Sequence, residues 1–137
     1  MIYLDTNVLL YATLSKVDNK SQQEIAISIL KELVTNNSLI LSNLSLLEYS
    51  FVMQKANEDI TKTKDAIRLF NRFVKSEKDN FNNEIAGFFD NQNAFKNSFD
   101  LYHIIFANSY NCQKLITFDK GFKKFKDICS LEIEIIK

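Results

Sequence analysis

Glycine, histidine and cysteine are scarce in this chain of 137 residues, and their scarcity excludes several kinds of site. A single histidine excludes a metal site with several histidine ligands. Two glycines exclude both the G-x-G-x-x-G dinucleotide loop and the Walker phosphate loop. Two cysteines, Cys112 and Cys129, are too few for a disulfide framework or a zinc knuckle, so we expect buried thiols in a reducing cytoplasm.

An excess of charge and a long apolar run are also lacking. The formal net charge is +0, so an anionic polymer would have to bind at a local basic patch or through a metal ion. No apolar run could span a bilayer and no signal peptide is recognisable. We therefore expect a cytoplasmic protein without membrane contact, whose mature chain begins at Met1. The length and an apolar content of 46% predict one domain over residues 1–137.

Strand and helix patterns alternate along the chain. Short apolar runs predict buried strands, and a last segment of alternating acidic and apolar residues predicts a half-exposed edge strand. The four strand segments are 2–4, 39–41, 114–118 and 131–136. Helical spacing and capping residues predict helices at 8–12, 21–36, 44–56, 61–75, 83–89 and 98–112. This alternation predicts an α/β sandwich with a mostly parallel sheet.

The middle of the chain, residues 76–98, has the least readable pattern. It is rich in asparagine, aspartate and lysine, with several phenylalanines embedded. A linker would not carry so many aromatic side chains, so we expect this segment to cover the body of the protein.

Four acidic residues share a position relative to the predicted sheet. Asp5 and Asp119 end strands, Asp100 opens a helix, and Glu48 lies early in the helix after the second strand. Strand ends and helix starts meet at one edge of a parallel sheet, where ligands bind. Crowded carboxylates repel one another, and a divalent cation resolves that conflict. Oxygen-only ligation suits Mg²⁺ or Mn²⁺.

Each of these carboxylates also has an ordinary structural alternative. These are a helix cap for Asp5, a capping box with Ser45 for Glu48, a helix start for Asp100 and a turn with Lys120-Gly121 for Asp119. Because the four acids share one predicted edge, we assign the cap of the first helix to Thr6 and Asn7 and leave Asp5 as a metal ligand.

A carboxylate cage for Mg²⁺ is suited to phosphodiester hydrolysis. The metal lowers the pKa of a bound water and neutralises charge on the phosphoryl oxygens, so no covalent nucleophile is needed. The sequence offers no Ser/His/Asp or Cys/His set that can be assembled instead.

Four motifs, in this order, resemble those of the PIN-domain ribonucleases, and more narrowly of the small VapC-type toxins of toxin–antitoxin pairs. They are Leu4-Asp5-Thr6-Asn7, Ser45-x-x-Glu48, Asp100-x-x-x-Ile104 and Thr117-Phe118-Asp119-Lys120-Gly121-Phe122. The resemblance implies a three-layer α/β/α sandwich and a Mg²⁺- or Mn²⁺-dependent endoribonuclease. It also implies a homodimer silenced by an antitoxin whose tail lies across the active site.

The resemblance also implies roles for individual residues. Asp5, Glu48, Asp100 and Asp119 would form the catalytic acidic quartet. Asp5, Asp100 and Asp119 would bind the metal, and Asn7 and Thr117 would support them.

Two parts of the chain depart from the family pattern. His103 stands where small residues are common, and residues 76–98 match poorly. His103 could be a base behind the metal site or a phosphate contact, but we favour a packed or half-exposed histidine.

Basic residues suggest where RNA would lie. Lysines crowd just beyond Asp119, and two arginines form a second basic pair. The candidates are Lys120, Lys123, Lys124, Lys126, Arg68 and Arg72. The alternative is a solvated basic turn, and the interleaved Phe122 and Phe125 are expected to lie in the core.

Other functions remain open at this level. One is a PIN-fold nuclease in RNA processing without an antitoxin, and another is a PIN-like module that only binds. A third is a receiver-like phosphoacceptor switch, which would need paired acids after the first strand and an aspartate after the third. The strand at 39–41 is followed by Ser42-Asn43 instead, so the acceptor is missing.

Overall fold

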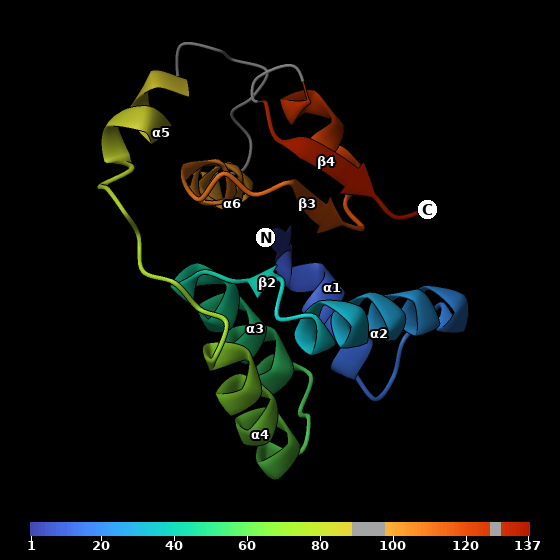
Figure 1. Cartoon of the computed structure of the whole chain (residues 1–137). Helices are drawn as coiled ribbons and strands as arrows, with labels where there is room; N and C mark the ends of the chain where they lie inside the picture. The colour runs from blue at the N-terminus through green and yellow to red at the C-terminus, as the bar shows by residue number, and fades with distance from the viewer. Residues whose placement is uncertain (89–97, 127–129) are drawn as a thin grey trace.

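Four parallel strands form the central sheet in the order β2-β1-β3-β4 (Figure 1). The computed structural model describes residues 1–88, 98–126 and 130–137. The strands are β1 Ile2–Leu4, β2 Leu39–Ile40, β3 Lys114–Thr117 and β4 Glu132–Ile135. β1 pairs with both β2 and β3, so the carboxyl end of β1 lies between the ends of two neighbours.

The helices cover both faces of this sheet. They are α1 Thr6–Thr13, α2 Lys20–Thr35, α3 Asn43–Lys55, α4 Ile60–Asn71, α5 Asn82–Phe88, α6 Ser98–Ser109 and the 3-10 helix η2 Lys120–Phe125. Figure 1 shows α1 to α4 on one side of the sheet and α5 and α6 on the other.

Alternate residues of β1, β2 and β3 point into different cores. Tyr3 and Leu115 belong to the core beneath α6 and η2, while Leu4 and Ile116 belong to the core beneath α1 to α4. This alternation is what a strand covered on both faces requires. The predicted three-layer α/β/α sandwich with a mostly parallel sheet is therefore confirmed.

Several predicted helix boundaries were wrong, and two of them have a clear structural reason. Asn19, not Ser21, caps α2, and its side chain accepts a hydrogen bond from the Gln22 amide at 3.1 Å. α4 ends at Asn71, and the chain then extends beside β2, where Leu41 forms a parallel bridge with Val74. The apolar stripe that suggested a longer helix continues past Asn71 because Phe73 is buried and Val74 is partly buried in this extension.

The central segment partly covers the body, as expected. Phe81 is buried in the core beneath α6, and the predicted short helix is present as α5. Residues 89–97 lie outside the described residues. Within the described ranges, no helix is both long enough and apolar enough to cross a membrane.

Candidate active site

Asp5 leaves the end of β1 with both carboxylate oxygens hydrogen-bonded. Oδ1 accepts from the Thr6 amide at 2.8 Å, and Oδ2 accepts from Thr117 Oγ1 at 2.7 Å. The backbone of Asp5 is extended and Thr6 is already helical, so Asp5 is the N-cap of α1. The assignment of that cap to Thr6 and Asn7 was wrong. The side chain is 6% exposed, and burial raises its pKa.

Thr117 and Asn7 hold Asp5 and the chain that follows β3. Thr117 Oγ1 donates to Asp5 and accepts from Asn7 Nδ2 at 3.2 Å and from the Asp119 amide at 3.0 Å. Asn7 Oδ1 accepts from the Phe118 amide at 3.3 Å. The two predicted supporting residues therefore connect the start of α1 to the end of β3.

Asp119 lies at the carboxyl edge of the sheet and is exposed. Its Oδ1 accepts from the Gly121 amide at 2.8 Å and caps η2, so the predicted turn with Lys120-Gly121 is present. A Cβ atom at position 121 would lie 3.0 Å from that same oxygen, so a larger residue there would push the Asp119 carboxylate aside. The capping role leaves the rest of the carboxylate open to solvent.

Asp100 lies in the first turn of α6 and interacts electrostatically with Asp5 and Asp119. Its pKa is raised to about 6, mainly by burial and also by the charges of Asp5 and Asp119, while the charges of His103 and Lys124 act in the opposite direction. The three aspartates therefore share one electrostatic environment, although they are far apart in sequence.

Glu48 lies one turn into α3 and accepts two hydrogen bonds at the same oxygen. Thr6 Oγ1 donates to Oε1 at 2.7 Å, and His103 Nε2 donates to it at 2.6 Å. Burial raises its pKa, but the hydrogen bond and charge of His103 and the bond from Thr6 outweigh burial and lower the pKa. The capping-box alternative was wrong, because that box pairs Ser42 with Ser45.

His103 is buried, as the favoured interpretation predicted, but it is also bonded to the proposed quartet. It is 1% exposed, and its ring lies between Glu48 and Tyr3. Sequence reasoning missed both contacts. The available signal was the position of the chain's single histidine, one helical turn after Asp100.

The donor set fits a hard divalent cation by its chemistry. It consists of carboxylates, and the pKa values of Asp5 and Asp100 are raised, mainly by burial. A cation would relieve the repulsion between them. In the described ranges, no three acidic, histidine or cysteine side chains form a ready-made ligand set. The fit therefore rests on charge and donor type.

The basic residues predicted to bind RNA do not form one patch but lie at different sites on the protein. A pocket at the carboxyl ends of β3 and β4 is lined by Lys120, Lys123, Lys126, Lys137, Gln22, Phe118, Ile135 and Ile136. Lys124 instead lies near enough to Asp100 to lower its pKa. Arg68 is on α4 and Arg72 is the C-cap residue of that helix, which packs on the opposite face of the sheet from η2 (Figure 1). Phe122 and Phe125 are buried in the core, as predicted.

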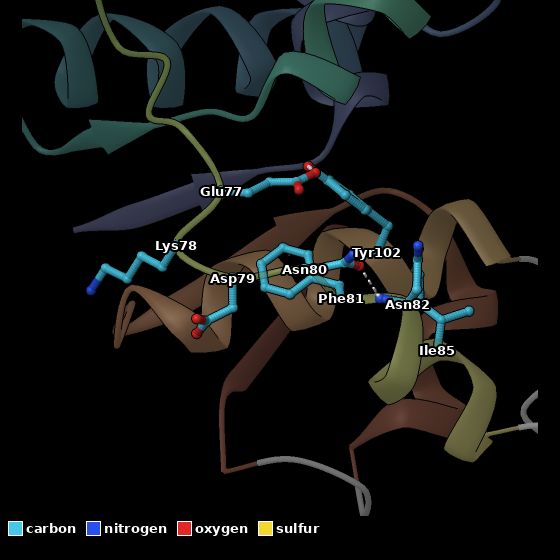
Figure 2. Close-up of a pocket in the computed structure, with 8 residues that line it drawn as sticks. All are labelled: Glu77, Lys78, Asp79, Asn80, Phe81, Asn82, Ile85 and Tyr102. Atoms are coloured by element: carbon cyan, nitrogen blue, oxygen red, sulfur yellow. Dashed lines mark hydrogen bonds between the residues drawn. The ribbon is translucent and has the colours of Figure 1, made fainter.

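Another hollow lies away from the proposed acids. Figure 2 shows it between the segment before α5 and the side of α6 that carries Tyr102. Tyr102 packs edge-on against Phe81 and donates to Glu77 Oε1 at 2.5 Å. Its lining contains none of the quartet, so this hollow is separate from the carboxylate site.

Comparisons with known proteins agree with this architecture. A model of the PIN domain family matches residues 2–128. A chain in the crystal structure of FitAcB from Neisseria gonorrhoeae has the same fold, with a TM-score of 0.68 and 16% identity over 98% of this chain and 96% of that chain. No curated protein matches the sequence. Because the family match spans nearly the whole sequence, the chain belongs to the PIN domain family, whose members are nucleases.

Proposed function

We propose that this protein is a metal-dependent endoribonuclease and the toxin of a type II toxin–antitoxin pair. The observation that carries the nuclease proposal is the electrostatic coupling of Asp5, Asp100 and Asp119 at the carboxyl edge of the sheet. The pKa values of Asp5 and Asp100 are both raised, and carboxylates with raised pKa values in one place are typical of a functional site. Membership of the PIN domain family gives the same class of chemistry.

The proposed roles follow from the contacts of each side chain. Asp5, Asp100 and Asp119 would hold Mg²⁺ or Mn²⁺, which when bound supplies a water of lowered pKa and neutralises phosphoryl charge. Thr117 fixes one oxygen of Asp5 and the backbone of Asp119. Glu48 accepts hydrogen bonds on one oxygen and is near enough to Asp5 to raise its pKa.

The proposed RNA path runs through the lysine pocket beside Asp119. Lys120, Lys123, Lys126 and Lys137 line it without an acidic neighbour in the lining. Since the chain has no net charge, such a local cluster is where a polyanion would be attracted. Lys124 would act closer to the carboxylates, and Arg68 and Arg72 lie outside this path.

The toxin role rests on the resemblance to VapC-type proteins and on small size. In this proposal the protein forms a homodimer, and the tail of an antitoxin covers the active site. The alternative is an RNA-processing nuclease without an antitoxin. Expression of the chain alone separates them: a toxin arrests growth and a neighbouring antitoxin gene relieves the arrest, whereas a processing nuclease leaves growth unchanged.

The test of the nuclease mechanism replaces single carboxylates by amides. We expect Asp5→Asn and Asp119→Asn each to abolish Mn²⁺-dependent cleavage of RNA. Asparagine keeps the capping oxygen, so both variants should retain the circular dichroism spectrum and thermal midpoint of a folded protein. Asp65→Asn, on the exposed face of α4, is the control and should cleave normally. Wild-type cleavage by both site variants would show that the carboxylate mechanism is wrong.

A further inference from the structure

The unexplained feature of the site is a buried hydrogen-bond chain behind Glu48. We propose that His103 is a positioning residue for Glu48 and that Tyr3, with Ser42 and Ser45, fixes His103. The role for catalysis rests on the proposed nuclease function. The structural claim does not, because it concerns the position of one imidazole ring.

The chain of hydrogen bonds is continuous from α3 to α6. His103 Nε2 lies 2.6 Å from Glu48 Oε1, and His103 Nδ1 is hydrogen-bonded to the Tyr3 hydroxyl. That hydroxyl lies 2.9 Å from both Ser42 Oγ and Ser45 Oγ. Tyr3, Ser42 and Ser45 are each 0% exposed, so water does not compete for these bonds.

The donors and acceptors of this chain are consistent with one another. An ionised carboxylate only accepts, so Nε2 of His103 carries a hydrogen toward Glu48. Nδ1 then accepts from Tyr3 when the ring is neutral, and donates to it when the ring is charged. The serine hydroxyls can rotate to suit either case. Within the described residues, every buried side-chain polar atom has a partner.

The consequence for Glu48 is a difference between its two oxygens. Oε1 takes both hydrogen bonds, from Thr6 and from His103. Among the described residues, Oε2 takes none. The carboxylate is thus held at one oxygen while the other is available to a water or a substrate group. Without His103, a glutamate with 30% of its side chain exposed would populate other rotamers.

The same chain also connects the elements that carry the other acids. Tyr3 lies on β1 just before Asp5, Ser42 and Ser45 begin the helix of Glu48, and His103 is on the helix that Asp100 opens. A buried polar network of this kind specifies one arrangement of its elements, because any shift leaves a polar group unpaired. Loss of the Tyr3 hydroxyl should therefore leave His103 Nδ1 without its partner and loosen the position of Glu48, with some loss of stability.

The first experiment pairs two buried tyrosines. Tyr3→Phe removes the hydroxyl of the chain, and Tyr49→Phe removes the hydroxyl that bonds Thr13 Oγ1 at 2.7 Å in the other core. Steady-state cleavage of a short RNA with Mn²⁺ is measured for both, with thermal unfolding alongside. We expect Tyr3→Phe to lower kcat about 10-fold at nearly unchanged KM, and Tyr49→Phe to leave kcat unchanged. Equal effects of the two substitutions on kcat would overturn the proposal.

The conservative variant separates positioning from packing. His103→Gln can still donate to Glu48, whereas His103→Leu fills similar space without a hydrogen bond. We expect His103→Gln to retain about 10-fold more kcat than His103→Leu. Equal loss in both would show that the ring acts only as core packing.

The second readout does not need activity. His103 is the chain's only histidine, so its ring ¹⁵N and ¹H signals are unambiguous. We expect a slowly exchanging Nε2 hydrogen whose shift changes in Glu48→Gln, and an Nδ1 signal that changes in Tyr3→Phe but not in Tyr49→Phe. A fast-exchanging ring hydrogen, unaffected by these variants, would overturn the proposal. If wild-type protein shows the chain but does not cleave RNA, the proposed function fails and the placement of His103 stands.

Discussion

Asp5 shows why cap and ligand are not alternatives for one carboxylate. Its Oδ1 caps α1, while its Oδ2 accepts from Thr117. A carboxylate offers about four acceptor directions, so these bonds orient it without using all of its capacity. Sequence reasoning identified the residue but treated the two roles as competing. Asp119 repeats the pattern, with one oxygen in the turn of η2.

Glu48 and His103 mark the limit of residue-level reasoning. They lie 55 residues apart in sequence, and neither helical spacing nor a capping motif signals their contact. The sequence pattern indicated that both lie near the carboxyl edge of the sheet, because Glu48 ends the Ser45-x-x-Glu48 motif and His103 lies within the Asp100-x-x-x-Ile104 motif. Their 2.6 Å contact depends on how α3 and α6 approach β1, which the sequence pattern does not determine.

The buried carboxyl of Asp100 is expected to lower the stability of the folded protein at neutral pH. Its folded pKa is raised from 3.8 to about 6, mainly by burial. The folded state therefore binds more protons between these values, and stability falls as pH rises through them. We expect Asp100→Asn to raise the free energy of unfolding at pH 7 by about 1 kcal/mol. This is less than the full shift implies, because the half-exposed carboxyl is screened by solvent.

Urea unfolding in the presence of EDTA measures this effect at pH 7 and again near pH 4. The gain from Asp100→Asn should shrink at the lower pH, where the wild-type carboxyl is largely protonated in the folded state. Asp65→Asn on exposed α4 is the control. A loss of stability in Asp100→Asn that is equal at both pH values would contradict the predicted charge effect.

At the scale of elements, continuous apolar runs were the reliable signal. They predicted β1, β2 and β3 nearly to the residue, because a strand buried on both faces is apolar over most of its length. Alternating residues gave β4, where Ile133 is buried between exposed Glu132 and Glu134. Helix starts were less reliable, since Asn19 and Ser21 both suit a cap and only packing selects one.

The end of α2 gives a prediction of its own. Asn37 has a φ of 53°, and the amides of Asn37 and Ser38 bond back to Val34 and Leu33. This is a left-handed helix stop, for which asparagine is tolerated and glycine preferred. We expect Asn37→Ala to lower the free energy of unfolding by about 1 kcal/mol and Asn37→Gly to leave it equal or slightly higher.

The neighbouring Asn36 is the matched control for that prediction. Its φ is −82°, so Asn36→Ala should change the free energy of unfolding much less. Chemical denaturation of the three variants gives the comparison. If Asn36→Ala and Asn37→Ala are equally destabilising, the left-handed conformation is not the cause.

At the scale of the whole molecule, strand order assembles the site from distant segments. Because β1 lies between β2 and β3, the segments that follow these strands meet at one edge of the sheet. The side chains of Asp5, Glu48, Asp100 and Asp119 lie on or beside this edge. The lysine pocket is assembled in the same way. Gln22 from α2 and Lys137 after β4 join Lys120 and Lys123. The sequence indicated only the local lysine run, because the other members come from other elements.

The lysine pocket predicts a salt-dependent contribution to RNA binding. The Asp5→Asn variant, which should not cleave, allows affinity for a short single-stranded RNA to be measured by fluorescence anisotropy at several salt concentrations. Adding Lys120→Ala and Lys123→Ala should weaken binding and reduce the slope of log affinity against log salt. We expect the slope to fall by about 0.7 for each RNA phosphate that a lysine no longer neutralises.

Arg68→Ala with Arg72→Ala in the same background is the matched control, because it removes the same charge from the opposite layer. The slope should then stay at its original value. Both double variants lose two positive charges, and this loss weakens the general attraction to RNA equally. A local contact is therefore identified only by a difference between the two variants in the slope of log affinity against log salt. If both pairs reduce the slope equally, RNA responds to overall charge, and the path along the carboxyl ends of β3 and β4 is wrong.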